Sequence, residues 1–294
     1  APEFKELASR DVVSRCEQTE INEGRGIDGC VLLDVRHLGE KYISERLSQI
    51  RDLAMDFANV DMAKEPVPIM PGMHYQMGGV KANVDGETGV PGLYAAGEVA
   101  CVSVHGGNRL GANSLLDTLV FGRRSGVHAA ERAKNASHLS IDDSAAKPDR
   151  ENIQKLLSND KNESFGKIRF DMGTAMKEHF GVFREKSSMA EGISKLNLIK
   201  QRAESVYVAD KTKTFNTNLL FTLELEFMIE CAETIASSAF DRTESRGAHT
   251  RTDMPDRDDG NWLKHIVVSN EYGNPTISYK DVVITDWTPT VRQY

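Results

Sequence analysis

One stretch of the sequence, VHGGNRLGANSLLDTLVFGRRSG at residues 104–126, constrains the fold more than any other. Its first half is punctuated by glycines and its second half carries apolar residues at helical spacing, which predicts a loop that runs into a helix ending near Lys134. The glycine spacing differs from that of a G-x-G-x-x-G phosphate loop. The loop carries His105, Asn108 and Arg109, which a simple connection does not need. We therefore interpret the stretch as a binding loop whose paired glycines let the backbone approach a ligand.

Asn113 and Ser114 stand where that helix is expected to begin. Both are favoured N-cap residues, so helix capping alone is the plain interpretation. A helix N-terminus also presents unsatisfied N–H groups and the positive end of the helix dipole, which attract an anionic ligand. The residues alone leave both interpretations open.

The composition narrows the kind of protein. The 294 residues are 39% hydrophobic and 27% charged, an ordinary globular balance that is sufficient for one or two domain cores. The net charge of -8, with no basic face, argues against free nucleic acid as a partner. No apolar run approaches the ~18 residues of a membrane span. The first residues, APEFKELASR, are polar and lack a starting Met, so we expect no signal peptide and a chain cut from something longer.

The four cysteines are scattered along the chain without a C-x-x-C pair: Cys16, Cys30, Cys101 and Cys231. Their spacing excludes the usual zinc and iron–sulfur motifs within this chain, and we expect no metal site. Free thiols in a reducing compartment are the plain interpretation. Cys101 is expected to be a small buried apolar residue rather than a nucleophile.

The N-terminal pattern predicts a small mixed α/β unit. Ser9 is the expected N-cap of a first helix, VLLDV at residues 31–35 predicts a short buried strand, and apolar residues from Leu38 to Phe57 follow helical spacing. The proline-rich KEPVPIMPG is extended and ends the unit. Two short strands, in HYQMGGV and GLYAAGEVA, are then expected around the turn DGETGVPG.

From about Asp142 the pattern is helical, and the short connections predict an antiparallel bundle. The residues of its last helix that can face a core are Leu220, Leu223, Phe227, Ile235 and Phe240. The C-terminal part returns to a loop and β pattern. Its expected strand residues are Ile266, Val268, Ile277, Tyr279, Val282 and Ile284. The charged run RTESRGAHTRTDMPDRDD, before those strands, would ordinarily be a solvated loop with ion pairs.

Four polar or charged side chains are candidates for chemistry. His74 and Arg109 together form a candidate anion clamp, because arginine offers a bidentate fork that matches a carboxylate. Taken singly, His74 is more often structural and Arg109 is as often part of a salt bridge. Glu98, after YAAG, could accept hydrogen bonds from ribose hydroxyls. Arg10, at a helix start, would ordinarily be a solvated or ion-paired surface group.

Four segments together resemble the succinate dehydrogenase flavoprotein family: LASRDVVSR, HYQMGGV, GLYAAGEVACVSVHGGNRLGANSLLD and RTESRGAHTRTDMPDRDD. Their order and spacing match, over essentially the whole chain. The resemblance implies an α/β plus α fold with a partial flavin-binding domain. Residues 1–73 then resemble part of a capping domain and residues 74–130 the C-terminal part of the FAD-binding domain. Residues 131–241 resemble a helical bundle domain and residues 242–294 a small C-terminal α+β domain.

The family oxidises succinate to fumarate, passing a hydride to FAD and releasing a proton. The resemblance implies that His74 and Arg109 hold the dicarboxylate and that Arg10 is catalytic, as the proton acceptor. Fixed cationic groups suit a dianion and set the geometry between its carbon atoms and the flavin. A free guanidinium keeps its proton below a pH of ~12, so Arg10 could act only within a relay tuned by its neighbours.

The same resemblance assigns the cofactor contacts. Glu98, Ser114 and Leu115 match positions that contact FAD. The helix N-terminus at Asn113 and Ser114 would stabilise the negative charge of the reduced flavin. His105 lies near the substrate by position, with no role that follows from the residues.

The chain departs from the family in what it lacks. The N-terminal dinucleotide-binding βαβ unit is absent, as is the histidine that carries covalent flavin. Also absent are a further histidine and threonine for the substrate and the acidic partner of the arginine relay. We therefore expect residues 1–294 alone to bind FAD poorly and to be inactive, which a flavin titration would test.

The resemblance also implies partners and a location. An iron–sulfur subunit and membrane anchor subunits are the expected partners, with succinate and fumarate as ligands. The location is the cytoplasmic face of the bacterial inner membrane or the matrix side of the mitochondrial one, as a peripheral protein. Fumarate reductase and L-aspartate oxidase stay open as alternatives, although the extended C-terminal segment favours a respiratory subunit. A fragment that binds the iron–sulfur subunit without catalysis is the alternative of another class.

Overall fold

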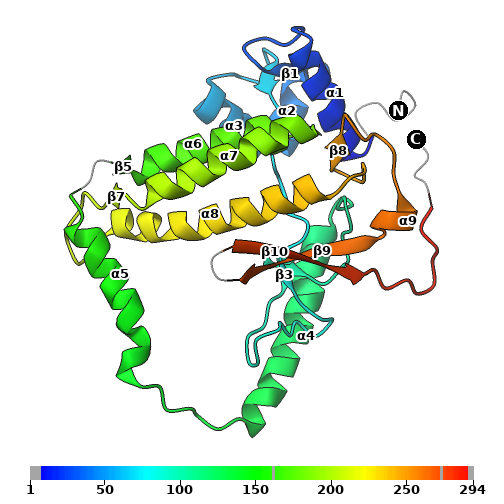
Figure 1. The fold of residues 1–294 in the computed structure, drawn as a ribbon. Helices are drawn as coiled ribbons and strands as arrows, with labels where there is room; N and C mark the ends of the chain where they lie inside the picture. The colour runs from blue at the N-terminus through cyan, green and yellow to red at the C-terminus, as the bar shows by residue number, and fades with distance from the viewer. Residues whose placement is uncertain (1–7, 161–162, 272–273, 291–294) are drawn as a thin grey trace. The chain divides into compact units, whose positions relative to one another are not determined.

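The computed structural model describes residues 8–160, 163–271 and 274–290. The chain divides into two compact units (Figure 1). Among the described residues, unit 1 consists of residues 8–75 with Thr290, and unit 2 of those between Gln76 and Pro289. The mixed α/β plus α fold predicted from the sequence is confirmed, while the four-domain division stays a prediction.

Unit 1 joins three short helices to one small sheet. Strand β1 pairs antiparallel with β2, and Val31 lies opposite Ile69. The elements are α1 (Arg10–Asn22), β1 (Val31–Leu33), the 3-10 helix η2 (Arg36–Leu38), α2 (Glu40–Arg46), α3 (Ser48–Ala58) and β2 (Val67–Ile69). Ser9 stands at the N-cap of α1, as predicted, but its side chain makes no cap hydrogen bond.

Two expectations for unit 1 are corrected. The strand at residues 31–33 is half-buried or exposed rather than buried. The helical pattern from Leu38 to Phe57 is broken at Leu47, whose φ of -125° ends α2 before α3 begins. Ile43 is fully buried, whereas Phe57 is 85% exposed. Helical periodicity identified the helices, but little of their apolar face is covered in this chain.

The first part of unit 2 holds the predicted binding loop. It consists of β3 (Val80–Lys81), the 3-10 helix η3 (Gly97–Val99), β4 (Ala100–Cys101) and α4 (Asn113–Asn135). Strands β3 and β4 pair in parallel, which Gly79 permits, because a Cβ there would overlap the carbonyl of Val99. The intervening turn closes with a bridge between Glu87 and Tyr94. We call β3, η3, β4 and α4 with their connections the flavin-like part, because they lie in the residues that resemble part of a FAD-binding domain.

The helical bundle follows, and Figure 1 shows α6, α7 and α8 side by side. Its elements are η4 (Asp143–Ala146), α5 (Lys147–Ser158), β5 (Glu163–Ser164), α6 (Phe165–Phe180), α7 (Lys186–Ala203), β7 (Val206–Tyr207) and α8 (Thr217–Asp241). Of the residues that we expected in the core, Leu220 and Phe227 are exposed, whereas Phe240 packs against it. The core uses the opposite side of α8, with Leu225, Ile229 and small alanines that let the helices approach.

The C-terminal part packs a turn and a hairpin onto the bundle. Its elements are β8 (Thr250–Arg251), which pairs in parallel with β6 (Phe183–Arg184), then α9 (Asp259–Trp262), β9 (Lys264–Glu271) and β10 (Asn274–Asp281). Strands β9 and β10 form the predicted antiparallel pair, with Ile277 opposite Val268. Val282 and Ile284 lie beyond the end of β10, so their assignment to a strand was wrong.

Candidate functional site

The candidate residues fall in both units. Arg10 and His74 belong to unit 1. The remaining five belong to unit 2: Glu98, Arg109, Asn113, Ser114 and Leu115. The clamp of His74 with Arg109 therefore pairs residues of two units and stays a prediction. Within unit 2 the structure places all five on one continuous run of η3, β4, a loop and α4.

Both candidate residues of unit 1 are exposed. Arg10 is the first residue of α1. Burial raises the pKa of Glu17, two turns further along α1, and the positive charge of Arg10 partly offsets that rise. The charge of Arg10 thus acts on a carboxyl group of its own helix.

Glu98 lies in the 3-10 helix that precedes β4. It is exposed, and its Oε1 accepts a hydrogen bond of 2.9 Å from the backbone N–H of Gln76. Gly97 lets η3 approach α4, because a Cβ at Gly97 would lie 3.3 Å from Oγ1 of Thr118. The carboxylate is therefore held at the amino-terminal end of the parallel β3–β4 pair.

The binding loop, residues 102–112, contains an unusual backbone. Ser103 has a φ of 74° and Ala112 a φ of 64°, in the left-handed region that residues other than glycine rarely adopt. Gly106, with a φ of 57°, adopts the same region without penalty. Arg109 is half-buried, and its Nη1 donates to the carbonyl of Leu110 at 3.1 Å. The guanidinium is therefore oriented within the loop that carries it.

The start of α4 differs from the prediction. Ala112 is the N-cap residue, and no side chain caps the helix, so the expected N-cap pair of Asn113 and Ser114 was wrong. The left-handed Ala112 directs the chain straight into the helix, which makes Asn113 the first helical residue. The carbonyls of Leu110 and Ala112 accept from the N–H groups of Asn113 and Leu115. Asn113 and Ser114 are left as polar, half-buried side chains of the first turn.

A buried pair inside this region was missed by the sequence reasoning. Nε2 of His105 lies 3.1 Å from Oδ2 of Asp117, and their side chains are 8% and 2% exposed. Asp117 stands in the apolar run of α4, twelve positions after His105. A single acid in an apolar run was the sequence signal that could have indicated this buried pair. A buried carboxylate requires such a partner. His105 therefore attaches the loop to α4.

The charged segment at residues 242–259 is also not a solvated loop. Glu244 and Arg251 are each 1% exposed. Glu244 accepts from Arg242 at 2.6 Å and from Arg246 at 2.6 Å, and its other oxygen accepts the N–H of Asp258. A buried acid with this many donors is fully satisfied, so the segment forms a rigid polar core.

His249 links that segment to the bundle. Nη1 of Arg184 donates to Nδ1 of His249 at 2.7 Å. Burial lowers the pKa of His249 to about 3, and the charges of Arg184, Arg242 and Arg251 contribute to the decrease. Burial also lowers the pKa of Arg184 to about 10. At neutral pH a neutral histidine thus accepts a hydrogen bond from a charged arginine.

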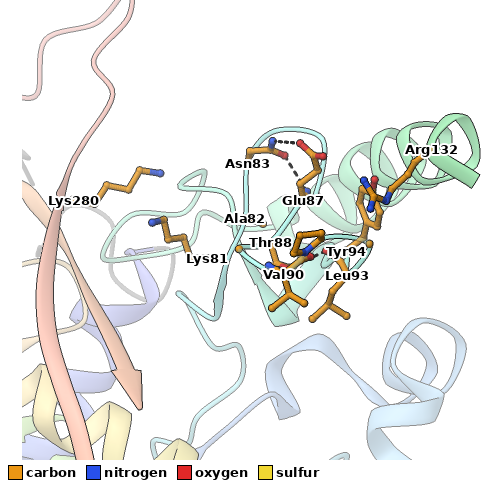
Figure 2. Close-up of a pocket in the computed structure, with 13 residues that line it drawn as sticks. Lys81, Ala82, Asn83, Glu87, Thr88, Val90, Leu93, Tyr94, Arg132 and Lys280 are labelled. Atoms are coloured by element: carbon orange, nitrogen blue, oxygen red, sulfur yellow. Dashed lines mark hydrogen bonds between the residues drawn. The ribbon is translucent and has the colours of Figure 1, made fainter. Parts of the chain in front are cut away.

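A separate pocket of about 450 Å³ lies beside the turn between β3 and β4 (Figure 2). Figure 2 shows Lys81 and Lys280 at one end and Arg132, on α4, at the other. The side chain of Asn83 donates to Glu87 at 2.8 Å on its rim. The residues that line it include none of the seven candidates. The pocket is therefore distinct from the predicted site.

The flavin-like part carries groups whose chemistry suits a flavin nucleotide. An exposed carboxylate at Glu98 suits hydroxyl donors, and the first turn of the 23-residue α4 suits negative charge. Leu115 is 70% exposed, and a Cβ at Gly111 would meet no atom within 4 Å. The site thus combines an apolar surface, open space and polar groups at its margin, as cofactor sites do.

Neither a metal centre nor a membrane span is found in the described part of the chain. No group of three or more His, Cys, Asp or Glu side chains there could hold a metal ion. No helix among the same residues is long and apolar enough to cross a bilayer. The four cysteines are free thiols, and Cys101 is half-buried.

Two family models match the chain. Residues 3–115 match the FAD binding domain and residues 169–294 match the fumarate reductase flavoprotein C-terminal domain. The first ends inside α4, at Leu115, and therefore includes the whole binding loop.

Individual proteins are similar along nearly the whole chain. The fumarate reductase flavoprotein subunit of Haemophilus influenzae is 42% identical over 99% of this chain and 50% of its own length. The succinate dehydrogenase flavoprotein subunit of Coxiella burnetii is 45% identical over 91% of this chain and 48% of its own length. The chain thus spans about half the length of the curated relatives it matches. A solved E. coli quinol fumarate reductase is similar with a TM-score of 0.91 and 40% identity, over 97% of this chain and 50% of that one.

Proposed function

We propose a function from one premise: the chain belongs to the succinate dehydrogenase and fumarate reductase flavoprotein family. This is a family of FAD-dependent oxidoreductases, and FAD is the cofactor that the matched domain indicates. When bound, FAD supplies a centre that accepts a hydride from a substrate or returns one.

The proposed reaction is the interconversion of succinate and fumarate, with succinate oxidation as the working direction. Within it, Arg109 and His74 hold the two carboxylates and Arg10 accepts the proton. Most support comes from Arg109, because its loop lies between Glu98 and the first turn of α4, the two places that fit a flavin. A cation held there would bring a dianion close to the reactive part of the cofactor.

The two carboxylate-binding residues differ in what they offer. Arginine presents five N–H donors in a planar fork that matches a carboxylate, and it stays charged at any working pH. Histidine offers a single donor whose charge depends on pH. Arg109, which is permanently charged, is therefore assigned to one carboxylate of the substrate. His74 is assigned to the other.

Arg10 is the least conventional assignment, since a guanidinium holds its proton strongly. Arg10 is therefore proposed as one member of a relay, with its acidic partner expected outside residues 1–294. Glu17, on the same helix, is a carboxyl group whose pKa is raised by burial and lowered by the charge of Arg10.

Partners and location follow from the same premise. We infer an iron–sulfur subunit, membrane anchor subunits and a quinone as the electron route, and a peripheral position on the cytoplasmic or matrix side of the membrane. The similar E. coli structure is a quinol fumarate reductase, which supports a quinone-linked assembly.

Fumarate reduction is the second candidate, because a fumarate reductase subunit is as similar as a succinate dehydrogenase subunit, at 42% and 45% identity. Assays of the full-length, FAD-loaded protein with succinate plus an artificial acceptor, and with fumarate plus a reduced donor, separate the two. A faster rate in the second assay would reverse the proposed direction.

The central test is the substitution Arg109→Lys in the full-length protein. Lysine keeps the charge but loses the fork, so we expect succinate turnover to fall by about 100- to 1,000-fold with FAD and fold retained. Arg123→Lys, at an exposed position on α4, is the matched control and should leave turnover unchanged. Near-normal turnover in Arg109→Lys would remove Arg109 from the site.

A further inference from the structure

The binding loop, residues 102–112, is strained at both ends. Ser103 and Ala112 hold positive φ angles of 74° and 64° without being glycine. Such residues persist only where the surrounding structure over-determines them, and they concentrate at ligand-binding sites. The groups that hold this backbone are therefore part of how the loop works.

Within the described part of the chain, three contacts tie residues 103–107 to separate segments. Ser103 Oγ lies 2.8 Å from Nε2 of His265 on β9. His105 bonds to Asp117 on α4. The backbone N–H of Ala248 donates to the carbonyl of Gly107 at 2.8 Å. Two of the three anchors thus lie more than 130 residues further along the chain, in the C-terminal part.

The contact between Gly107 and the C-terminal turn is a direct approach of two backbones. A Cβ at Gly247 would overlap the carbonyl of Gly107, and Gly247 has a φ of 60°. A Cβ at Gly107 would lie 3.1 Å from the carbonyl of Arg246. Only glycine at position 247 leaves room for the loop where the structure places it.

The turn that receives the loop is rigid. Arg246 and His249 exchange backbone hydrogen bonds of 2.8 and 3.0 Å. The side chain of Arg246 bonds to the buried Glu244 and, at 2.7 Å, to Asp259. His249 is bonded to Arg184 of the bundle. A loop resting on this turn is therefore fixed relative to the bundle and not only to its own helix.

We propose that the turn 246–249 and His265 form a positioning platform that sets the conformation of the binding loop and so the direction of Arg109. The proposal rests on the proposed function, in which Arg109 holds a carboxylate of the substrate. In this assignment Gly247, Ala248 and His265 touch no substrate. They act through the loop, and they lie too far from it in the sequence for a local motif to include both.

The first test is Gly247→Ala in the full-length, FAD-loaded protein. We expect faster hydrogen exchange across residues 104–112, unchanged exchange in α6–α8, and turnover lower by about 100-fold because the guanidinium is displaced. Gly24→Ala is the control, since Gly24 also has a positive φ, of 76°, but no atom within 4 Å of an added Cβ. It should change neither loop exchange nor turnover.

A second pair of variants applies if Gly247→Ala does not fold. His265→Ala removes the partner of Ser103 and should weaken fumarate binding, read from the flavin absorbance, while speeding exchange at residues 102–106. His265→Gln, whose amide can occupy the place of Nε2, should restore both. Equal defects in the two variants would overturn His265 as a positioning residue.

The outcomes separate the platform from the proposed function. Unchanged loop exchange and unchanged fumarate affinity in Gly247→Ala and His265→Ala would overturn the platform, whatever Arg109 does. Altered loop exchange in Gly247→Ala, together with normal turnover in Arg109→Lys, would leave the platform in place and overturn the role of Arg109. Reduced turnover with wild-type loop exchange in Gly247→Ala would also overturn the platform.

Discussion

The bundle and the flavin-like part each contain one long helix, and the two helices are packed in opposite ways. In the bundle, α8 has 25 residues and buries a continuous side that includes Leu225 and Ile229. In the flavin-like part, α4 has 23 residues and its buried residues are polar, Asp117 and Ser125. Its leucines face outward, with Leu119 72% exposed. The bundle is therefore held by an apolar core, and the flavin-like part by glycine-mediated close approaches and polar contacts.

The difference shows what each region is built for. A side-chain core determines stability, because burial of apolar area is the main favourable term in folding. The flavin-like part has a core of three alanines, Ala82, Ala95 and Ala100, with Val102 packed against it. It can stabilise little on its own, but it places polar groups and backbone at defined positions. The apolar core of unit 2 thus lies in the bundle, while its five candidate site residues lie in the flavin-like part.

Truncating a leucine side chain should give the largest difference in the free energy of unfolding between the two regions. Leu196 on α7 is 2% exposed, so Leu196→Ala should lower the free energy of unfolding by about 2–5 kcal/mol, through lost burial and a cavity. Leu119→Ala on α4 should change it by less than about 0.5 kcal/mol, because that side chain is already in water. Urea denaturation of both variants is the measurement. Similar losses would show that α4 is covered in solution and would break the comparison.

Close approach through glycine provides the next effect. A Cβ at Gly192, on α7, would lie 2.5 Å from Cβ of His179 and 2.6 Å from the ring of Phe180. Gly192→Ala should therefore destabilise the bundle by about 1–3 kcal/mol through overpacking. Thermal unfolding followed by circular dichroism measures it. A variant as stable as the wild type would mean that α6 and α7 can separate at no cost.

The sequence predicted most of the secondary structure because periodicity and turn residues are local signals. The helix of the binding loop was expected to end near Lys134 and ends at Asn135. The bundle helices were found for the same reason. We misjudged which side of α8 faces the core because we gave weight to large apolar residues such as Leu220 and Phe227. The side that packs against the neighbouring helices carries alanines instead.

The polar contacts were beyond sequence reasoning because they join distant segments. Nothing local indicates that Gly247 meets Gly107, or that His265 meets Ser103. The N-cap pair failed for a related reason. Asn113 and Ser114 have the right chemistry, but a left-handed Ala112 is the N-cap, so the helix already begins at Asn113. The candidate residues themselves came from motifs, and their roles stay predictions.

The link between the bundle and the C-terminal turn should respond to acid. The pKa of His249 is about 3 in the fold, against an ordinary value near 6.5. Between these pH values the unfolded chain binds a proton that the folded chain excludes, so stability falls as the pH falls through this window. The loss is at most about 1.4 kcal/mol per pH unit, or about 2 kcal/mol from pH 6.5 to 5.

His249→Gln provides the control for that effect, because glutamine can accept from Arg184 and does not titrate. Urea denaturation at pH 7.5 and pH 5 should show a smaller loss in the variant than in the wild type. Above pH 6.5 the two should have the same pH dependence. Equal losses at pH 5 would assign the acid sensitivity to other groups.

The smallest effect tests whether the two regions unfold together. Gly173 on α6 and Gly122 on α4 are exposed helical glycines with no atom within 4 Å of an added Cβ. Each change to alanine should stabilise its helix by about 0.4–1 kcal/mol, mainly by restricting the unfolded chain. Gly173→Ala should slow hydrogen exchange throughout α6–α8, because the bundle shares one core. Gly122→Ala should slow exchange in α4 alone, because that helix lacks a shared apolar core. Slower exchange in both regions from either substitution would show that the binding loop and its platform couple them into one cooperative unit.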